Sequence, residues 1–305
     1  MSPSPVPGIT VRAPGKINLA LRVGPRREDG YHPLATVFQA VSVYEDVTAR
    51  PADALGITVT GAQADQVPTD ATNLALRAAE LLARTVGIEP LVHLHVHKGV
   101  PVAGGMAGGS ADAAAALVAC DALWGTGLSR AALSDLAATL GADVPFSLLG
   151  HTAVGSGRGD LLSPALSSGQ YHWALALRRT GLSTPAVFAR FDATDGPAAL
   201  PEPEPDVALL AALRSADLDA VGRALGNDLQ AAALDLAPEL ADTLAVATRA
   251  GALGVLVSGS GPTVAALART RVHALAIAAE ITAAGVADDV LCAAGPVAGA
   301  RVVTG

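Results

Sequence analysis

Apolar and polar residues alternate along the first strand-like segment of the chain, Val11–Val23. Ile17 and Leu19 point to one side and are expected in a core, because successive side chains of a strand point to opposite faces. Lys16 and Asn18 share the other face, roughly 7 Å apart along the strand. The pattern therefore predicts a strand that presents a lysine and an amide together.

The rest of the first half reads as strands alternating with helices. Strand-like patterns cover Thr36–Tyr44, Leu91–Lys98 and Thr152–Val154. Helical periodicity predicts helices over Asn73–Val86, after the glycines near 109, and from Ser129 as N-cap to Gly141. Pro145 is expected to hold Val144 in an extended conformation.

The pattern changes after Pro164. A strand at Trp173–Leu177 precedes helices at Pro185–Phe191, Val207–Leu213, Leu218–Leu234 and Pro238–Ala250. Strands at Val255–Val257 and Thr263–Leu267, a helix at Val272–Ala284 and a strand at Val290–Ala293 follow. This order predicts a split βαβ domain. We therefore expect two domains, residues 1–163 and 164–305.

Composition narrows the class of protein. Of the 305 residues, 51% are hydrophobic and 3% aromatic, which predicts Ala-rich helices packed closely on sheets. The net charge of −8 and the absence of a basic run argue against nucleic-acid binding. No apolar run predicts a membrane span. Cys120 and Cys292 are expected as reduced, buried thiols, which favours the cytoplasm.

The segment Pro101–Leu117 carries the strongest chemical signal. Four glycines lie within 104–109, between a predicted strand and a predicted helix. Bare backbone N–H groups and a helix N-terminus favour phosphate binding. The P-loop pattern fails because Ser110 stands where its lysine belongs, and the Rossmann pattern fails because Met106 replaces its second glycine.

Three motifs now stand in order: Ala13–Leu19, Pro101–Leu117 and Ser258–Thr263. Through them the chain resembles the GHMP kinases. Further segments resemble the members of that superfamily that phosphorylate 4-diphosphocytidyl-2-C-methyl-D-erythritol, a precursor in non-mevalonate isoprenoid synthesis: Arg27–His32, Gly141–Phe146 and Gly157–Gly159.

The resemblance implies an α+β fold with a ribosomal-protein-S5-like N-terminal domain for ATP and catalysis. A ferredoxin-like C-terminal domain would bind substrate. ATP would enter as Mg-ATP, and no permanently bound metal, nucleic acid, membrane or obligate protein partner is expected. Taken singly, Lys16 and Asp143 could be an exposed strand lysine and a helix-end aspartate. The resemblance makes them the catalytic pair, with Asp143 as base and Lys16 beside the γ-phosphate.

The resemblance also implies which residues bind the nucleotide and the substrate. The nucleotide would contact Asn73, Pro101, Val102, Ala103, Gly104, Gly105, Met106, Ala107, Gly108, Gly109, Ser110 and Ala111. The substrate would contact Asn18, Tyr31, His32, Thr184, Phe188, Gly259, Ser260 and Gly261. Tyr31 would stack on the cytosine, His32 would hydrogen-bond its edge, and Phe188 would cover its other face.

Alternatives remain for several of these residues. Asn73 could instead cap a helix, Phe188 could be a core residue, and residues 259–261 could form only a tight turn. Ala107 and Ala111 replace a glycine and a serine usual in the family, so Ala107 requires a backbone angle that tolerates Cβ. His93, His95 and His97 are expected to face solvent rather than bind a metal.

The function also has two rivals. The same fold could serve another small alcohol, such as homoserine or mevalonate. A non-catalytic member could bind a ligand only.

Overall fold

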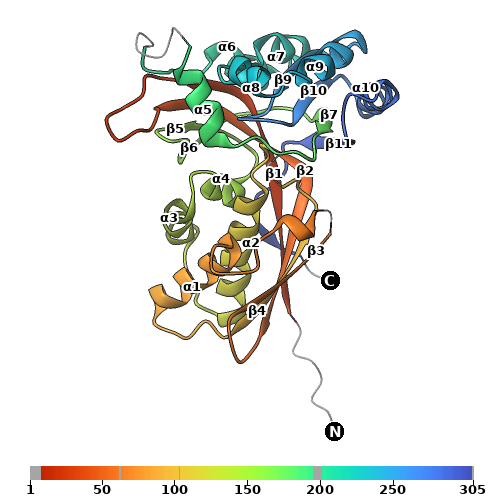
Figure 1. Cartoon of the computed structure of the whole chain (residues 1–305). Coiled ribbons are helices and arrows are strands. Elements are labelled where there is room, and N and C mark those ends of the chain that lie inside the picture. Colours follow the sequence, from red (N-terminus) through yellow and green to blue (C-terminus); the bar gives the residue numbers. More distant parts are fainter. Residues whose placement is uncertain (1–7, 62, 103, 195–200, 304–305) are drawn as a thin grey trace.

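The computed structural model describes residues 8–61, 63–102, 104–194 and 201–303. Within these residues the chain forms two β-sheets, each covered by helices, and the long strands β1 and β2 run from one lobe toward the other (Figure 1). The predicted α+β architecture is confirmed.

The first sheet has eight strands in the described residues: β1 (Ile9–Val23), β2 (Leu34–Pro51), β3 (Gly56–Gly61), β4 (Val92–Lys98), β5 (Thr152–Ser156), β6 (Leu161–Pro164), β8 (Gly226–Asn227) and β12 (Arg301–Val302). Five of them run in the order β12-β1-β2-β4-β3, while β5 and β6 extend from β2 and β8 lies beside β1. A short 3₁₀ helix at Ala64–Gln66 follows β3.

The helices of this lobe are α1 (Leu74–Val86), α2 (Gly108–Trp124), α3 (Arg130–Leu140) and α4 (Val144–Leu149). They gather on one side of the sheet (Figure 1). Helix α2 is buried along most of its length, and its alanines allow it to pack closely against both the sheet and α1.

The second sheet has the order β11-β7-β10-β9, with strands β7 (Tyr171–Leu177), β9 (Gly254–Val257), β10 (Val264–Ala268) and β11 (Asp289–Gly295). All its pairings are antiparallel, and a helix separates β10 from β11, as a split βαβ domain requires. Its helices are α5 (Thr184–Asp192), α6 (Val207–Ser215), α7 (Leu218–Ala224), α8 (Gln230–Leu236), α9 (Leu240–Arg249) and α10 (Arg271–Ala284).

Two short strands from the second half of the chain join the first sheet. Gly226 and Asn227 pair in parallel with Ala20 and Leu21 of β1, and β12 pairs antiparallel with Val11 and Arg12 nearer the start of that strand. The division into residues 1–163 and 164–305 stays a prediction, and these strands cross it.

Pairing with β1 also explains one wrong prediction. The single helix expected over Leu218–Leu234 is interrupted, because Gly226 and Asn227 are extended between α7 and α8. The Asn227 amide donates to the carbonyls of Val257 and Gly259, which ties this break to the second sheet. Gly and Asn are poor helix formers, so the tertiary contacts win at this point.

Two smaller predictions also fail. Val144 is not extended but begins α4, since Pro145 fits the first turn of a helix, where its missing N–H costs nothing. Cys292 is exposed rather than buried, because it lies on β11, an edge strand of the second sheet. Cys120 is free and buried as expected, and burial raises the pKa of its thiol to about 12.

Candidate active site

The glycine-rich segment follows β4 and opens helix α2, as the sequence predicts. Gly105 has φ +72°, and a Cβ on it would lie 2.4 Å from the Ser258 carbonyl oxygen, so this position requires glycine. The Ser258 hydroxyl donates to the carbonyl of Gly105 at 3.3 Å. The glycine-rich loop and the segment Ser258–Thr263 therefore touch each other across the two lobes.

Ala107 does not have the backbone angle that a residue with Cβ was expected to require. It stands at the N-cap of α2 with φ 59° and ψ 37°, a left-handed conformation that glycine adopts more readily. Its side chain makes no capping hydrogen bond, and the first residues of α2, Gly108, Gly109 and Ser110, line the adjoining cavity. The loop thus keeps its shape with an alanine at a strained position.

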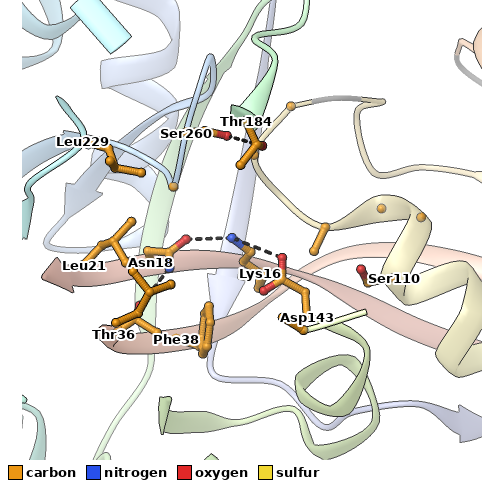
Figure 2. A pocket seen from close by; sticks show the side chains of 18 of the residues that line it. Lys16, Asn18, Leu21, Thr36, Phe38, Ser110, Asp143, Thr184, Leu229 and Ser260 are labelled. Carbon is orange, nitrogen blue, oxygen red and sulfur yellow. Dashed lines mark hydrogen bonds and ion pairs between the residues drawn. The ribbon is translucent and has the colours of Figure 1, made fainter. Parts of the chain in front are cut away.

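Lys16 lies on β1 beneath this loop. Its backbone N–H donates to the Met106 carbonyl at 3.1 Å, which fixes the strand against the loop. The ammonium donates to Asn18 Oδ1 at 2.7 Å and lies 3.9 Å from Asp143 Oδ2 (Figure 2). At that separation the lysine and aspartate attract as charges but do not form a hydrogen bond. The predicted pair is brought together.

Neighbouring side chains hold Lys16 and Asn18 in place. The Asn18 amide donates to Thr36 Oγ1 at 2.8 Å, and the Thr36 hydroxyl donates to the Ala20 carbonyl at 2.7 Å. The Phe38 ring lies 5.5 Å from the Lys16 ammonium. Thr36 and Phe38 were not predicted as site residues. They alternate on the predicted strand 36–44, so their common face could have indicated them.

Asp143 approaches from the N-terminus of α4. Its side chain is 34% exposed and makes no capping bond, whereas the Lys16 side chain is only 7% exposed. A carboxylate that does not cap its own helix and faces a buried cation is free to accept a proton from a bound molecule.

The second lobe closes the site from above. Gly259 has φ +58°, and a Cβ there would lie 3.4 Å from Lys16 Nζ and 3.2 Å from Asn18 Oδ1. Ser260 Oγ and Thr184 Oγ1 form a hydrogen bond of 2.8 Å across the turn (Figure 2). The backbone of this turn therefore lies directly against the lysine.

These groups line one cavity of about 490 Å³. It receives most of the predicted site residues: Lys16, Asn18, Pro101, Gly104, Gly105, Ala107, Gly108, Gly109, Ser110, Asp143, Thr184, Phe188, Gly259 and Ser260. Met106 and Ala111 are buried beneath the loop instead, and Gly261 is not part of the lining. Ala103 lies outside the described residues.

Tyr31 and His32 line an adjoining cavity of about 530 Å³ together with Phe188. The His32 and Phe188 rings stack with centroids 5.3 Å apart. His32 Nδ1 donates to the Gly24 carbonyl at 2.8 Å, and Nε2 lies 3.1 Å from Asp192 Oδ1. A hydrogen bond from His32 to a bound base would replace the contact with Asp192. Tyr31 is 57% exposed, which leaves its ring accessible.

Asn73 and Val102 line a third, smaller cavity of about 200 Å³ that shares Leu74 and Gly109 with the first. Asn73 is also the N-cap of α1: its side-chain oxygen accepts from Ala75 N at 2.8 Å, and its amide donates to the Pro68 carbonyl. The capping alternative is therefore observed, and the side chain borders a cavity as well.

A buried ionic cluster that the sequence did not indicate lies under the loop. Lys98 Nζ is 2.6 Å from Glu45 Oε1 and 2.6 Å from Asp112 Oδ2, and all three side chains are buried. Burial and the Asp112 carboxylate raise the pKa of Glu45 to about 8, while burial raises the pKa of Asp112. A Cβ on Gly108 would be 3.0 Å from Glu45 Oε1, so the cluster directly supports the loop.

The three histidines of β4 bond to the neighbouring strand β3. Thr58 and Thr60 hydroxyls lie 3.0 to 3.3 Å from their ring nitrogens. Within the described residues, no group of three or more His, Cys, Asp and Glu side chains is arranged to hold a metal ion. No helix in the same part of the chain is long and apolar enough to cross a bilayer.

Comparison with known proteins agrees with this geometry. The family described as "GHMP kinases N terminal domain" matches residues 73–151, and "GHMP kinases C terminal" matches residues 209–287. The chain is 56% identical over 296 residues to 4-diphosphocytidyl-2-C-methyl-D-erythritol kinase from Streptomyces coelicolor, which covers 97% of this chain and 99% of the relative.

Solved structures give the same picture. A crystal structure of 4-(cytidine 5'-diphospho)-2C-methyl-D-erythritol kinase is 33% identical with a TM-score of 0.76, covering 93% of this chain and 98% of that one. Homoserine kinase from Cytophaga hutchinsonii also has a TM-score of 0.76, at 21% identity, with 99% of each chain covered. At that identity the second likeness concerns the fold alone.

Proposed function

Because this chain belongs to the GHMP kinases, we propose that it transfers the γ-phosphate of ATP to the 2-hydroxyl of 4-diphosphocytidyl-2-C-methyl-D-erythritol. The observation that carries the proposal is the Lys16–Asp143 pair, 3.9 Å apart in a cavity lined by the glycine loop. The identity of 56% to a relative with this name supports the choice of substrate.

ATP would bind with its phosphates against residues 104–110. The N–H groups at the start of α2 and the positive end of its dipole would hold the phosphate oxygens. The smaller cavity beside Asn73 and Leu74 adjoins the loop and offers room for the base. Magnesium would accompany the ATP and screen its phosphate charge.

The acceptor would bind across the two larger cavities. Its cytosine would occupy the cavity of Tyr31, His32 and Phe188, and its methylerythritol part would reach Asn18 and Asp143. Thr184, Ser260 and the glycines around it would contact the substrate from the second lobe.

The reaction needs one proton transfer and one phosphoryl transfer. The Asp143 carboxylate accepts the proton of the 2-hydroxyl, whose oxygen bonds to the γ-phosphorus as the bond from that phosphorus to the leaving oxygen of ADP breaks. Lys16 donates to Asn18 in the free protein and is placed to stabilise the charge on the transferring group. We propose that this chemistry takes place in the cytoplasm.

Replacing Asp143 with Asn tests the proposal. The amide keeps the shape but cannot accept the proton, so kcat should fall by roughly 10²- to 10⁴-fold while ATP binding persists. ADP release with the cytidyl substrate measures kcat, and a thermal melt checks the fold. Undiminished turnover would remove Asp143 as base. Equal turnover of homoserine or mevalonate, with an unchanged KM in Tyr31→Ala, would instead favour another alcohol.

A further inference from the structure

The cavity that contains Lys16 and Asp143, called here the catalytic cavity, adjoins the cavity of Tyr31 and His32. Five described residues border both: Leu34, Ala142, Arg158, Thr184 and Phe188. A molecule that occupies both cavities must pass along these residues. Under the proposed function, on which this inference rests, the part of the substrate between the cytidine and the methylerythritol is a diphosphate.

Arg158 is the one charged side chain among those five residues. The others are two aliphatic residues, a phenylalanine and a threonine, which cannot neutralise a diphosphate. Leaving that anion without a cation at the passage between two cavities would cost binding energy, since partial burial weakens its hydration. Its charge therefore makes Arg158 the residue of these five that is suited to bind a diphosphate.

The local geometry leaves the Arg158 guanidinium available. Arg158 stands in the chain between two glycines with left-handed backbones, Gly157 at φ +68° and Gly159 at φ +93°. The side chain is 52% exposed, and among the residues that the structure describes its one ion pair is with Asp160 at 3.2 Å. Its guanidinium lies 5.7 Å from the centre of the Tyr31 ring. The Arg158 guanidinium thus lies at the edge of the catalytic cavity and extends toward the cavity of Tyr31 and His32, called here the base cavity because it would hold the cytosine.

The nearby cations are less suited to this role. Lys16 is committed to Asn18 and Asp143 inside the catalytic cavity. Arg26 borders only the base cavity and faces Asp192 at 3.5 Å. A guanidinium also matches phosphate oxygens with two parallel N–H donors, which an ammonium cannot do.

We propose that Arg158 binds the diphosphate of the cytidyl substrate and so joins recognition of the base to placement of the acceptor hydroxyl. Binding exchanges part of the Asp160 contact for phosphate oxygens. The residue is a substrate-binding group, and no proton or phosphoryl group is transferred through it.

Calorimetric titration with cytidine and with CDP separates this role from simple stacking on Tyr31. In Arg158→Gln the Kd for CDP should rise roughly 10- to 100-fold, as expected for lost charge-assisted hydrogen bonds, while the Kd for cytidine changes little. In Arg158→Lys the charge is kept and CDP binding should be partly restored. Arg26→Gln is the matched control and should leave the ratio of the two Kd values unchanged.

Kinetics give an independent readout. Arg158→Gln should raise the KM for the cytidyl substrate, with the KM for ATP unchanged, and a thermal melt should show that the fold is intact. Equal losses of cytidine and CDP binding, or no loss of either, would overturn the proposal. Failure of the wild-type protein to phosphorylate the cytidyl substrate would instead refute the proposed function, and the titrations would still decide whether Arg158 binds a diphosphate.

Discussion

Two lysines lie next to the glycine loop, and each faces carboxylates in a different way. Lys98 is in contact with Glu45 and Asp112 at 2.6 Å, and all three side chains are sealed from solvent. Lys16 stands 3.9 Å from Asp143, whose side chain is one-third exposed. The same residue types thus form a closed cluster with Lys98 and an open pair with Lys16.

The difference indicates what each cluster does. The closed cluster satisfies its own charges and supports Gly108 from beneath, so its contribution is structural. In the open pair, the carboxylate and ammonium do not neutralise each other completely, and both face a cavity. Incomplete pairing is the condition under which a cation can stabilise a phosphate and a carboxylate can take a proton.

The largest expected effect comes from opening the closed cluster. Lys98→Met leaves the carboxyl groups of Glu45 and Asp112 buried without their cation, which should lower the free energy of unfolding by about 3–5 kcal/mol. Urea denaturation measures it. Arg269→Met is the control, because its ion pair with Asp219 at 2.6 Å is exposed and should change stability little. Equal stability of the Lys98 variant and the wild type would contradict a structural role for the cluster.

Lys16→Met should lower activity strongly and stability little, the reverse of what is expected for Lys98→Met. Losing the cation beside the transferring phosphate should lower kcat by roughly 10²- to 10³-fold, the usual effect of removing one transition-state donor. The free energy of unfolding should change far less than in Lys98→Met, because Asp143 remains partly solvated. Steady-state kinetics and urea denaturation on the same preparation check both. Similar losses of stability in Lys16→Met and Lys98→Met would contradict the proposed difference between a structural cluster and a catalytic pair.

The third expected effect is a pH dependence of stability. The pKa of Glu45 is about 8 in the folded protein, above its ordinary value of 4.5, so the folded state holds a proton that the unfolded state releases. The free energy of unfolding should therefore fall as pH rises from about 4.5 to about 8 and level off above that. The raised pKa of Asp112 acts in the same direction.

Glu45→Gln should make this slope shallower, as measured by urea denaturation across that pH range. Asp219→Asn serves as control, because a hydrogen bond from Arg269 lowers the pKa of Asp219 and places its titration below the window. An unchanged slope in Glu45→Gln would show that the cluster does not hold the proton.

The two clusters also differ in whether they could be predicted from the sequence. Lys16, Asp143 and the glycine loop stand in motifs through which the chain resembles the GHMP kinases, so that resemblance predicted their meeting. No sequence motif singles out Lys98 or Glu45, which the fold buries beneath the loop. Burial of a charge depends on segments far apart in the chain, which local patterns do not encode.

The same reason explains the missed elements. Strands β8 and β12 span two residues each, too few for any periodicity, and they exist because β1 offers unpaired backbone groups on its edge. The left-handed backbone of Ala107 was not anticipated either, because its residue type disfavours it and the surrounding loop imposes it. Arg158 belongs to the segment Gly157–Gly159, through which the chain resembles its family. Its place between two adjoining cavities is apparent only in the fold.

The pairing of β12 with β1 has a consequence for how the protein is made. β1 is synthesised long before Arg301–Val302, which pair with one part of its edge. Until those residues have been translated, the nascent chain carries an open strand edge, and such edges invite association with other chains. The sheet that holds Lys16 is completed only after β12 has left the ribosome.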